Sequence, residues 1–212
     1  MNLMFLGPPG AGKGTQAVRL AEKFNIPHIS TGDMLRQEIK NGTELGEKAK
    51  AYISEGKLVP DDVIIGMIEG RIAKPDAREG FILDGFPRTR EQAQALEGFT
   101  KLDAVVNIDS RDDQIVKRIC GRRVCDECGA IYQESKLTNK ASCLKCGGRL
   151  CVREDDNEET IRKRLCEYKK KTMPLIGFYA ERGILHNIPD NGTIDDITQN
   201  ILAVLCTVYD SI

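Results

Sequence analysis

The chain has 212 residues, of which 41% are hydrophobic and 30% charged, and its formal net charge is −1. This length allows one well-buried domain with modest insertions and is short for two full domains. The near-neutral charge argues against a protein that coats nucleic acid or an anionic membrane, and no apolar run reaches the roughly 18 residues of a membrane helix. With no secretion signal, the eight cysteines are expected to be reduced or bound to metal in a cytoplasmic protein.

Short apolar strands alternate with helical stretches along the chain. Strands are predicted at 3–6, 27–29, 81–83, 104–108 and 184–188, and helices at 13–24, 61–73, 89–97, 111–120, 157–182 and 194–206. This alternation predicts an α/β fold, a parallel sheet flanked by helices. Right-handed crossovers would bring the carboxyl ends of the strands, and any ligand, to one edge of the sheet.

Two segments interrupt this alternation. Residues 30–59 are polar and helical (33–40 and 44–56) without a strand of their own. Residues 121–156 carry four of the eight cysteines and show little helical periodicity. We interpret both as insertions at the ligand-binding edge of a core domain formed by residues 1–29, 60–120 and 157–212.

The first strand leads into a glycine-rich loop, Gly-Pro-Pro-Gly-Ala-Gly-Lys-Gly-Thr at 7–15, and a helix follows. This is the context that a phosphate-binding GxxxxGK pattern requires, so the fold is expected to be of the phosphate-loop NTPase type. Backbone N–H groups and the helix N-terminus would bind phosphate oxygens, with a charge added by the lysine. The expected triphosphate-binding residues are Gly10, Ala11, Gly12, Lys13, Gly14 and Thr15.

The expected Mg²⁺ ion has two sequence signals. Gly14 stands where a Ser or Thr usually follows the lysine, and Thr15 comes one place later, which favours a water-mediated metal over a direct hydroxyl ligand. Asp84 ends the third predicted strand, a placement typical of the acid that organises Mg²⁺ in phosphate-loop enzymes. The structural alternative for Asp84 is a turn or helix-capping residue before Gly85.

Further motifs narrow the class of nucleotide-binding protein. They are STGDMLR at 30–36, GKLVPD at 56–61, DGFPRT at 84–89, GRR at 121–123 and REDDNE at 153–158, followed by Arg164. In order and spacing, from Met1 to about Ile201, they resemble the adenylate kinases. The resemblance implies reversible phosphoryl transfer, ATP + AMP = 2 ADP, which serves adenine nucleotide homeostasis. It also implies a monomer that uses Mg²⁺ with ATP, and two mobile subdomains: an AMP-binding insertion at 30–59 and a lid at 121–156.

The resemblance also implies roles for individual side chains. Arginine suits phosphate because its planar guanidinium binds in two places and stays charged. Arg36 and Arg88 would hold the AMP phosphate, Arg122 would reach ATP, and Arg153 and Arg164 would bridge the transferring group. Asp155 and Asp156 would orient these arginines. The implied catalytic set is Lys13, Asp84, Arg88, Arg122, Arg153 and Arg164, which acts by positioning and electrostatics without a nucleophilic side chain.

The two nucleotide sites follow from the same resemblance. Gln92 suits an adenine edge because its amide offers both a donor and an acceptor. The Phe86–Pro87 bond is expected to be cis, in a turn that aims Arg88. The implied ATP site adds Arg122, Ile131, Tyr132 and Gly192 to the phosphate loop. The implied AMP site contains Thr31, Arg36, Lys57, Leu58, Val59, Gly85, Phe86, Pro87, Arg88, Gln92, Arg153 and Arg164.

Two CxxC pairs, Cys125–Cys128 and Cys143–Cys146, are separated by fourteen residues. Four thiolates at this spacing suit tetrahedral Zn²⁺, and a glycine after each pair permits a tight turn. Four protein ligands leave no open position, so the zinc would be structural and would replace the core that a small insertion lacks. Zinc-bearing lids occur in part of the resembling family. Disulfides are the alternative, and the other four cysteines are expected to be ordinary apolar residues.

Three other functions remain to be weighed. The CxxC pairs, with Lys136, Lys140, Lys145 and Arg149 nearby, are also compatible with a zinc ribbon that binds nucleic acid. The segment Asn139-Lys140-Ala141-Ser142 superficially resembles the guanine-reading NKxD of a GTPase switch, but Ser142 replaces the acid. Within the enzyme class, a UMP/CMP kinase is the nearest alternative.

Overall fold

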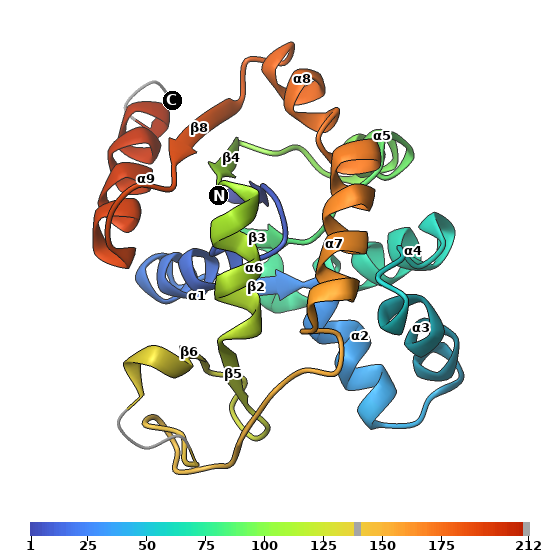
Figure 1. The fold of residues 1–212 in the computed structure, drawn as a ribbon. Coiled ribbons are helices and arrows are strands. Elements are labelled where there is room, and N and C mark those ends of the chain that lie inside the picture. The colour runs from blue at the N-terminus through green and yellow to red at the C-terminus, as the bar shows by residue number, and fades with distance from the viewer. Residues whose placement is uncertain (138–140, 210–212) are drawn as a thin grey trace.

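A five-stranded parallel sheet forms the centre of the molecule in the computed structural model, which describes residues 1–137 and 141–209 (Figure 1). The strand order is β2-β3-β1-β4-β8. These strands are β1 (Asn2–Leu6), β2 (His28–Ser30), β3 (Phe81–Asp84), β4 (Ala104–Asp109) and β8 (Leu185–Pro189). They lie within one or two residues of the five predicted strands, and the α/β fold of the phosphate-loop NTPase type is confirmed.

Hydrophobic residues alternate between the two faces of the central strand. Leu3 and Phe5 pack into a core shared with α1 (Lys13–Phe24) and α9 (Ile194–Tyr209). Met4 and Leu6 pack into a second core on the opposite face. The helices that contribute to that second core include α4 (Asp61–Ile72), α5 (Arg90–Phe99) and α8 (Leu175–Ala180). Both faces of β1 are therefore covered, as is usual for a parallel sheet.

Two smaller units occupy the segments that interrupt the predicted alternation. Residues 31–54 form α2 (Thr31–Lys40) and α3 (Glu44–Ser54), which begin after the capping side chains of Ser30 and Thr43. The second unit is an antiparallel sheet in the order β6-β5-β7, formed by β5 (Arg122–Cys125), β6 (Ile131–Gln133) and β7 (Leu150–Cys151). It follows α6 (Asp112–Cys120) and precedes α7 (Glu158–Glu167), and Figure 1 shows it below the central sheet.

The prediction of one helix over 157–182 is wrong, because the helix is interrupted after α7. Residues Tyr168–Thr172 form a π-helical turn in which the N–H of Met173 donates to the carbonyl oxygen of Tyr168, 2.8 Å away. Pro174 explains the interruption: it has no N–H, and its ring would conflict with the carbonyl four residues earlier. Widening the turn by one residue removes that conflict and leads into α8. Two 3₁₀ turns, Pro75–Ala77 and Glu134–Lys136, complete the described elements.

The carboxyl ends of β1, β2 and β3 meet at one edge of the sheet. Phe5 and Ser30 are both in register with Asp84, so the phosphate loop, the start of α2 and the DGFPRT segment lie next to one another. The Phe86–Pro87 peptide bond in that segment is cis, as predicted. Ligands of open α/β sheets bind at this edge, which is where the predicted site residues converge.

Candidate active site

The phosphate loop connects β1 to the N-terminus of α1. Gly12 caps this helix in a left-handed conformation, with φ 90°, no side-chain cap and no acidic residue in the first turn. The free N–H groups and positive end of the helix dipole therefore face the loop, which favours an anion. Position 7 has room only for glycine, because the backbone of Ile108 passes close to it. A Cβ there would lie 2.4 Å from the carbonyl oxygen of Ile108.

Lys13 points back into the loop that precedes it. Its Nζ donates to the carbonyl oxygens of Gly7 and Pro8, both at 2.7 Å. Burial lowers the pKa of Lys13 from its ordinary value to about 8, against the opposing effect of Asp84, and the positive charges of neighbouring arginines lower it further. With this pKa the Lys13 ammonium group is still mostly charged at neutral pH, so it can attract a phosphate group.

Asp84 lies beside the start of α1. Its Oδ2 is 3.5 Å from Nε2 of His28 and would be 3.2 Å from a Cβ at position 14. Gly14 therefore leaves room for this carboxylate. Although burial opposes ionisation, His28 and Lys13 hold the pKa of Asp84 below its usual value. An ionised carboxylate beside the phosphate loop fits the chemistry of Mg²⁺.

Arginines predicted to bind phosphate gather around this loop. Burial lowers the pKa of Arg88 to about 10, with Arg164 the next cause. Burial also lowers the pKa of Arg153 to about 10, with Arg36 and Arg122 contributing. All of them stay charged at neutral pH, so a polyanion bound among them would interact with several positive charges at once. Since Arg88, Arg164 and Arg122 also act on the pKa of Lys13, these arginines and the loop form one cluster.

Carboxylates hold several of these arginines in place. Asp156 accepts from Nε of Arg122 at 2.7 Å and also from its NH2 group, and its side chain is fully buried. Asp155 accepts from NH1 of Arg164 at 2.7 Å. The expected orienting partners are thus in contact with the arginines, in the bidentate geometry that fixes a guanidinium plane at Asp156.

Asp33 joins the two inserted units. Its Oδ1 lies 2.6 Å from NH2 of Arg36, on the same helix, and 3.3 Å from NH2 of Arg153. Although burial opposes ionisation, these two guanidinium groups lower the pKa of Asp33. Arg36 and Arg153 are therefore held close to each other by one carboxylate.

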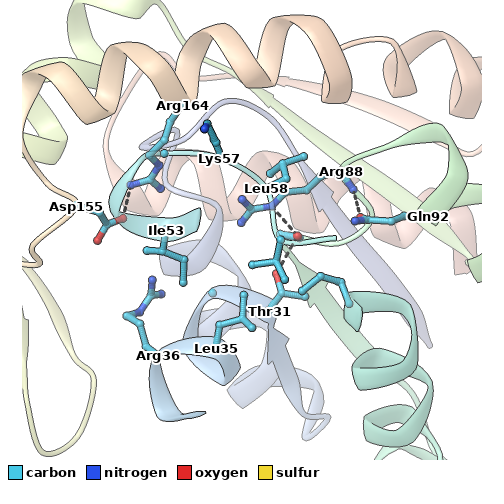
Figure 2. Close-up of a pocket in the computed structure, with 15 residues that line it drawn as sticks. Thr31, Leu35, Arg36, Ile53, Lys57, Leu58, Arg88, Gln92, Asp155 and Arg164 are labelled. Carbon is cyan, nitrogen blue, oxygen red and sulfur yellow. Dashed lines mark hydrogen bonds and ion pairs between the residues drawn. The ribbon is translucent and has the colours of Figure 1, made fainter. Parts of the chain in front are cut away.

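A pocket lies between α2, the end of α3 and the DGFPRT segment (Figure 2). Within it, the Thr31 hydroxyl and the Nε of Arg88 both donate to the carbonyl oxygen of Gly85, at 2.8 and 2.7 Å. Apolar side chains of Leu35, Ile53 and Ile64 form part of its wall. Nine of the predicted AMP-site residues line it: Thr31, Arg36, Lys57, Leu58, Val59, Gly85, Arg88, Gln92 and Arg164.

Some predicted residues lie elsewhere, and others were missed. Phe86 and Pro87 are buried, and with Arg153 they are not among the described residues that line the pocket. The lining residues that were not assigned to the AMP site from the sequence are Gly32, Leu35, Ile53, Gly56, Ile64 and Asp155, of which Asp155 was expected to orient arginines. The apolar members have no chemical signature of their own; only the amphipathic spacing of the helices that carry them could have indicated an inward face.

Residues predicted to contact the ATP base lie on separate elements. Ile131 and Tyr132 belong to β6, where Ile131 is 40% exposed and the Tyr132 hydroxyl lies 3.3 Å from Sγ of Cys143. Gly192 follows β8 with φ 128°. Their role at the ATP base stays a prediction.

Four cysteine sulfurs cluster in the three-stranded unit. The Sγ atoms of Cys125, Cys128, Cys143 and Cys146 all lie within 4.8 Å of one another. Two of these separations are 3.5 Å (Cys125–Cys146) and 3.6 Å (Cys128–Cys143), too long for a disulfide. A tetrahedral zinc with Zn–S bonds of about 2.3 Å separates its sulfurs by about 3.8 Å, so the arrangement fits the predicted metal.

Comparison with known proteins agrees with this geometry. The family model described as adenylate kinase matches residues 5–184. The chain is 51% identical to the adenylate kinase of Archaeoglobus fulgidus (97% of this chain and 98% of that protein), 50% identical to that of Thermodesulfovibrio yellowstonii (97% and 99%) and 50% identical to that of Listeria monocytogenes serotype 4a (97% and 99%).

The alternative functions are not favoured by these similarities. Two residues of the NKxD-like segment, Asn139 and Lys140, lie outside the described residues, and Ser142, at the position of the acid, forms a β-bridge with Arg149 in the cysteine-bearing unit. Among the helices that the structure describes, none is long and apolar enough to cross a membrane.

The family match and the relatives, which extend over nearly the whole chain, establish that the chain belongs to the adenylate kinase family of phosphotransferases.

Proposed function

We propose how this adenylate kinase family member carries out the reversible reaction ATP + AMP = 2 ADP. One observation carries the proposal: a phosphate loop and a separate pocket share one arginine cluster. Arg88 and Arg164 line the pocket and also act on the pKa of Lys13 in the loop. Two phosphate-bearing substrates placed at these two sites would meet at the arginines, where the transferred group carries its charge.

In this proposal each charged group has one task. The loop residues Gly10–Thr15 and Arg122 hold the ATP phosphates, while Arg36 and Arg88 hold the AMP phosphate. Arg153 and Arg164 neutralise the group in transit, and Lys13 supplies charge from the loop. Mg²⁺, bound to ATP and organised by Asp84 through water, would neutralise the outer phosphates. Because the nucleophile is an AMP phosphate oxygen, alignment and charge suffice.

The AMP base enters the pocket that Gln92 lines, and the ATP base lies near Ile131, Tyr132 and Gly192. Residues 30–59 and 121–156 act as movable insertions on a core of residues 1–29, 60–120 and 157–212. The contact between Asp33 and Arg153 supports this division, since it joins the two insertions through a pair of charged side chains. Closure of both would exclude water, which otherwise takes the phosphoryl group.

A structural Zn²⁺ at Cys125, Cys128, Cys143 and Cys146 completes the lid. The small core around these cysteines contains only Leu137 and Leu150 as further buried apolar residues among those described. Backbone N–H groups of Lys145 and Gly148 point at the sulfurs of Cys143 and Cys146, both at 3.4 Å, the outer contacts that thiolate ligands use. The metal would hold the lid's fold and take no part in chemistry.

We infer that the enzyme acts as a monomer, as the family resemblance implies. None of the eight cysteines forms a disulfide, which supports a reducing cytoplasmic compartment. The near-neutral net charge supports small nucleotides, without nucleic acid, as the partners.

The test is ADP formation from Mg-ATP with AMP, UMP and CMP offered in turn. We expect AMP to be the preferred acceptor by kcat/KM. Preference for a pyrimidine monophosphate would favour the UMP/CMP kinase alternative. ATP hydrolysis without an acceptor, or tight binding of DNA or RNA at moderate salt, would contradict the proposal.

A further inference from the structure

Asp61, the first residue of α4, makes two hydrogen bonds behind the AMP pocket. Its Oδ1 accepts from Nε2 of Gln92 at 2.7 Å, and its Oδ2 accepts from the Thr89 hydroxyl at 2.8 Å. Thr89 in turn caps α5, where its Oγ1 accepts from the backbone N–H of Gln92. Asp61 is not among the described residues that line the AMP pocket, so it would act there only through its neighbours.

Gln92 is held from the other side by the backbone of Arg88. The Arg88 N–H donates to Oε1 of Gln92 at 2.7 Å, and the Gln92 residue is only 2% exposed. A carboxylate accepts only and a backbone N–H donates only. If the Gln92 amide were rotated by 180°, its oxygen would face the Asp61 carboxylate, acceptor against acceptor. Its NH₂ group would face the Arg88 N–H, donor against donor. Two opposed partners therefore fix the orientation of this amide.

The fixed amide has one N–H and one oxygen lone pair left for a ligand. An adenine edge offers a donor at its 6-amino group and an acceptor at N1. A 6-oxopurine offers the reverse, an acceptor at O6 and a donor at N1. An amide locked in one orientation complements only one of these patterns, whereas an amide free to turn over would accept both.

We propose that Asp61 is a specificity-determining positioning residue: by fixing the Gln92 amide, it selects 6-amino over 6-oxo purine monophosphates. The inference rests on the proposed placement of AMP in the pocket. Sites that hydrogen-bond a substrate group reject analogues that leave buried partners unpaired, which gives this mechanism its discriminating power.

The negative charge of Asp61 can also stabilise α4 directly, and this effect must be distinguished from its effect on the Gln92 amide. A carboxylate in the first turn of a helix interacts favourably with the helix dipole. Asp62 occupies the same turn of α4 and is exposed. Asp62→Ala therefore removes the same charge from the same helix end without touching Gln92, and serves as the matched control.

The experiment compares kcat/KM for AMP and for inosine monophosphate, its 6-oxo counterpart, at saturating Mg-ATP. For Asp61→Ala we expect the AMP:IMP ratio to fall at least tenfold, chiefly through a lowered KM for IMP, with the KM for ATP unchanged. Asp61→Asn, which keeps one acceptor, should show a smaller fall, and Asp62→Ala none. An unchanged ratio in Asp61→Ala, or an equal fall in Asp62→Ala, would overturn the inference.

A double-mutant cycle tests whether Asp61 acts through the amide. In a Gln92→Ala background, Asp61→Ala should leave the AMP:IMP ratio unchanged; a further fall would mean that another contact carries the effect. If Asp61→Ala fails to fold by circular dichroism, Asp61→Asn decides the question alone. Wild-type protein that makes no ADP from ATP and AMP would refute the proposed function. Wild-type activity with an unchanged ratio in the variant would refute only this inference.

Discussion

The hydroxyl of Thr172 donates a 2.8 Å hydrogen bond to the carbonyl oxygen of Arg88, 84 residues earlier in the chain. Thr172 ends the π-helical turn and is 7% exposed. The N–H of Arg88 is bound by Gln92, and its Nε by the carbonyl of Gly85. Arg88 is therefore held at both ends of its backbone and along its side chain. The widened turn that Pro174 imposes places the Thr172 hydroxyl under a predicted phosphate-binding residue.

Thr172→Val tests this hold on Arg88. Valine keeps the shape of threonine and removes the hydroxyl, so the Arg88 carbonyl loses a partner in a largely buried place. We expect kcat/KM for AMP to fall about five- to tenfold, as the loss of one hydrogen bond implies, with little change in the KM for ATP. Steady-state kinetics with each nucleotide varied in turn measures this.

Two variants control for a general loss of stability. Thr172→Ser keeps the hydroxyl and should restore most of the AMP kinetics. Thr198 is also 7% exposed and donates to Gln16 at 2.7 Å, away from Arg88. Thr198→Val should lower the melting temperature by a similar amount without the selective effect on AMP. Equal changes in the AMP and ATP kinetics of Thr172→Val would show that Thr172 is only a packing residue.

Lys13→Ala removes the ammonium group from the phosphate loop. We expect kcat to fall on the order of 10²–10³-fold, as when one preorganised donor to transition-state charge is deleted, with the fold retained. Lys23→Ala, a charge deletion in the exposed last turn of the same helix, is the control and should be near wild type. A Lys13 variant with near-wild-type kcat would mean that the loop is not the site of transfer.

The pH dependence of kcat/KM for ATP should report Lys13. Burial lowers its pKa from the ordinary value of 10.5 to about 8, so the free enzyme carries the charge below that pH and loses it above. Since only the charged form attracts phosphate, kcat/KM for ATP should decline as pH rises through about 8. Under saturating nucleotide the decline in kcat should move to higher pH, because bound phosphates favour the ammonium form. A flat kcat/KM profile to pH 10 would contradict the assignment.

One zinc ion per chain is expected at the four clustered cysteines. Elemental analysis should find it in native protein, and chelation should loosen residues 121–156 in hydrogen exchange before the core unfolds, because thiolate ligation is coupled to local folding. Cys143→Ser should lose the metal, whereas Cys206→Ser, at an exposed position of α9, should keep it. Metal-free native protein with four freely titrating thiols in this cluster would refute the site.

The sequence anticipated those parts of the site that depend on local pattern. The phosphate loop, the strand that ends at Asp84 and the cysteine quartet all follow from residue type and spacing within short segments, and the cis bond before Pro87 was expected from the resemblance of its motif to the family. Such features are local, so a chain read without its fold can reveal them.

What the sequence did not show are contacts between distant segments. The Thr172–Arg88 bond spans 84 residues, and the bonds of Asp61 to Thr89 and Gln92 span about 30. None of them follows a helical or strand period. Gln92 was expected to face the adenine, and the structure shows in addition that its amide bonds to Asp61 and Arg88. The interruption at Tyr168–Thr172 was missed because the hydrophobic spacing continues past Pro174, while the proline ring does not permit a regular helix.

Closure of the two insertions over a bisubstrate ligand is the last expectation. Side chains already bridge them: Arg153 lies 3.3 Å from Asp33, and Nζ of Lys40 lies 3.4 Å from the carbonyl oxygen of Asp126. A ligand with two adenosines joined through a phosphate chain should occupy both nucleotide sites and bind more tightly than ATP or AMP alone, since linkage makes the second binding event intramolecular.

Hydrogen exchange and solution scattering distinguish closure from simple binding. AMP alone should protect mainly residues 30–59 and ATP alone mainly 121–156, whereas the linked ligand should protect both and reduce the radius of gyration. Exchange in the buried strand β1 serves as the internal control and should not change. Because the arginines expected to bind phosphate come from both insertions and the core, only a polyanion that spans them all can contact every one of them. A linked ligand that leaves residues 30–59 as exposed as in the free protein would therefore contradict the two-nucleotide site, and a single-nucleotide ATPase would then explain the phosphate loop better.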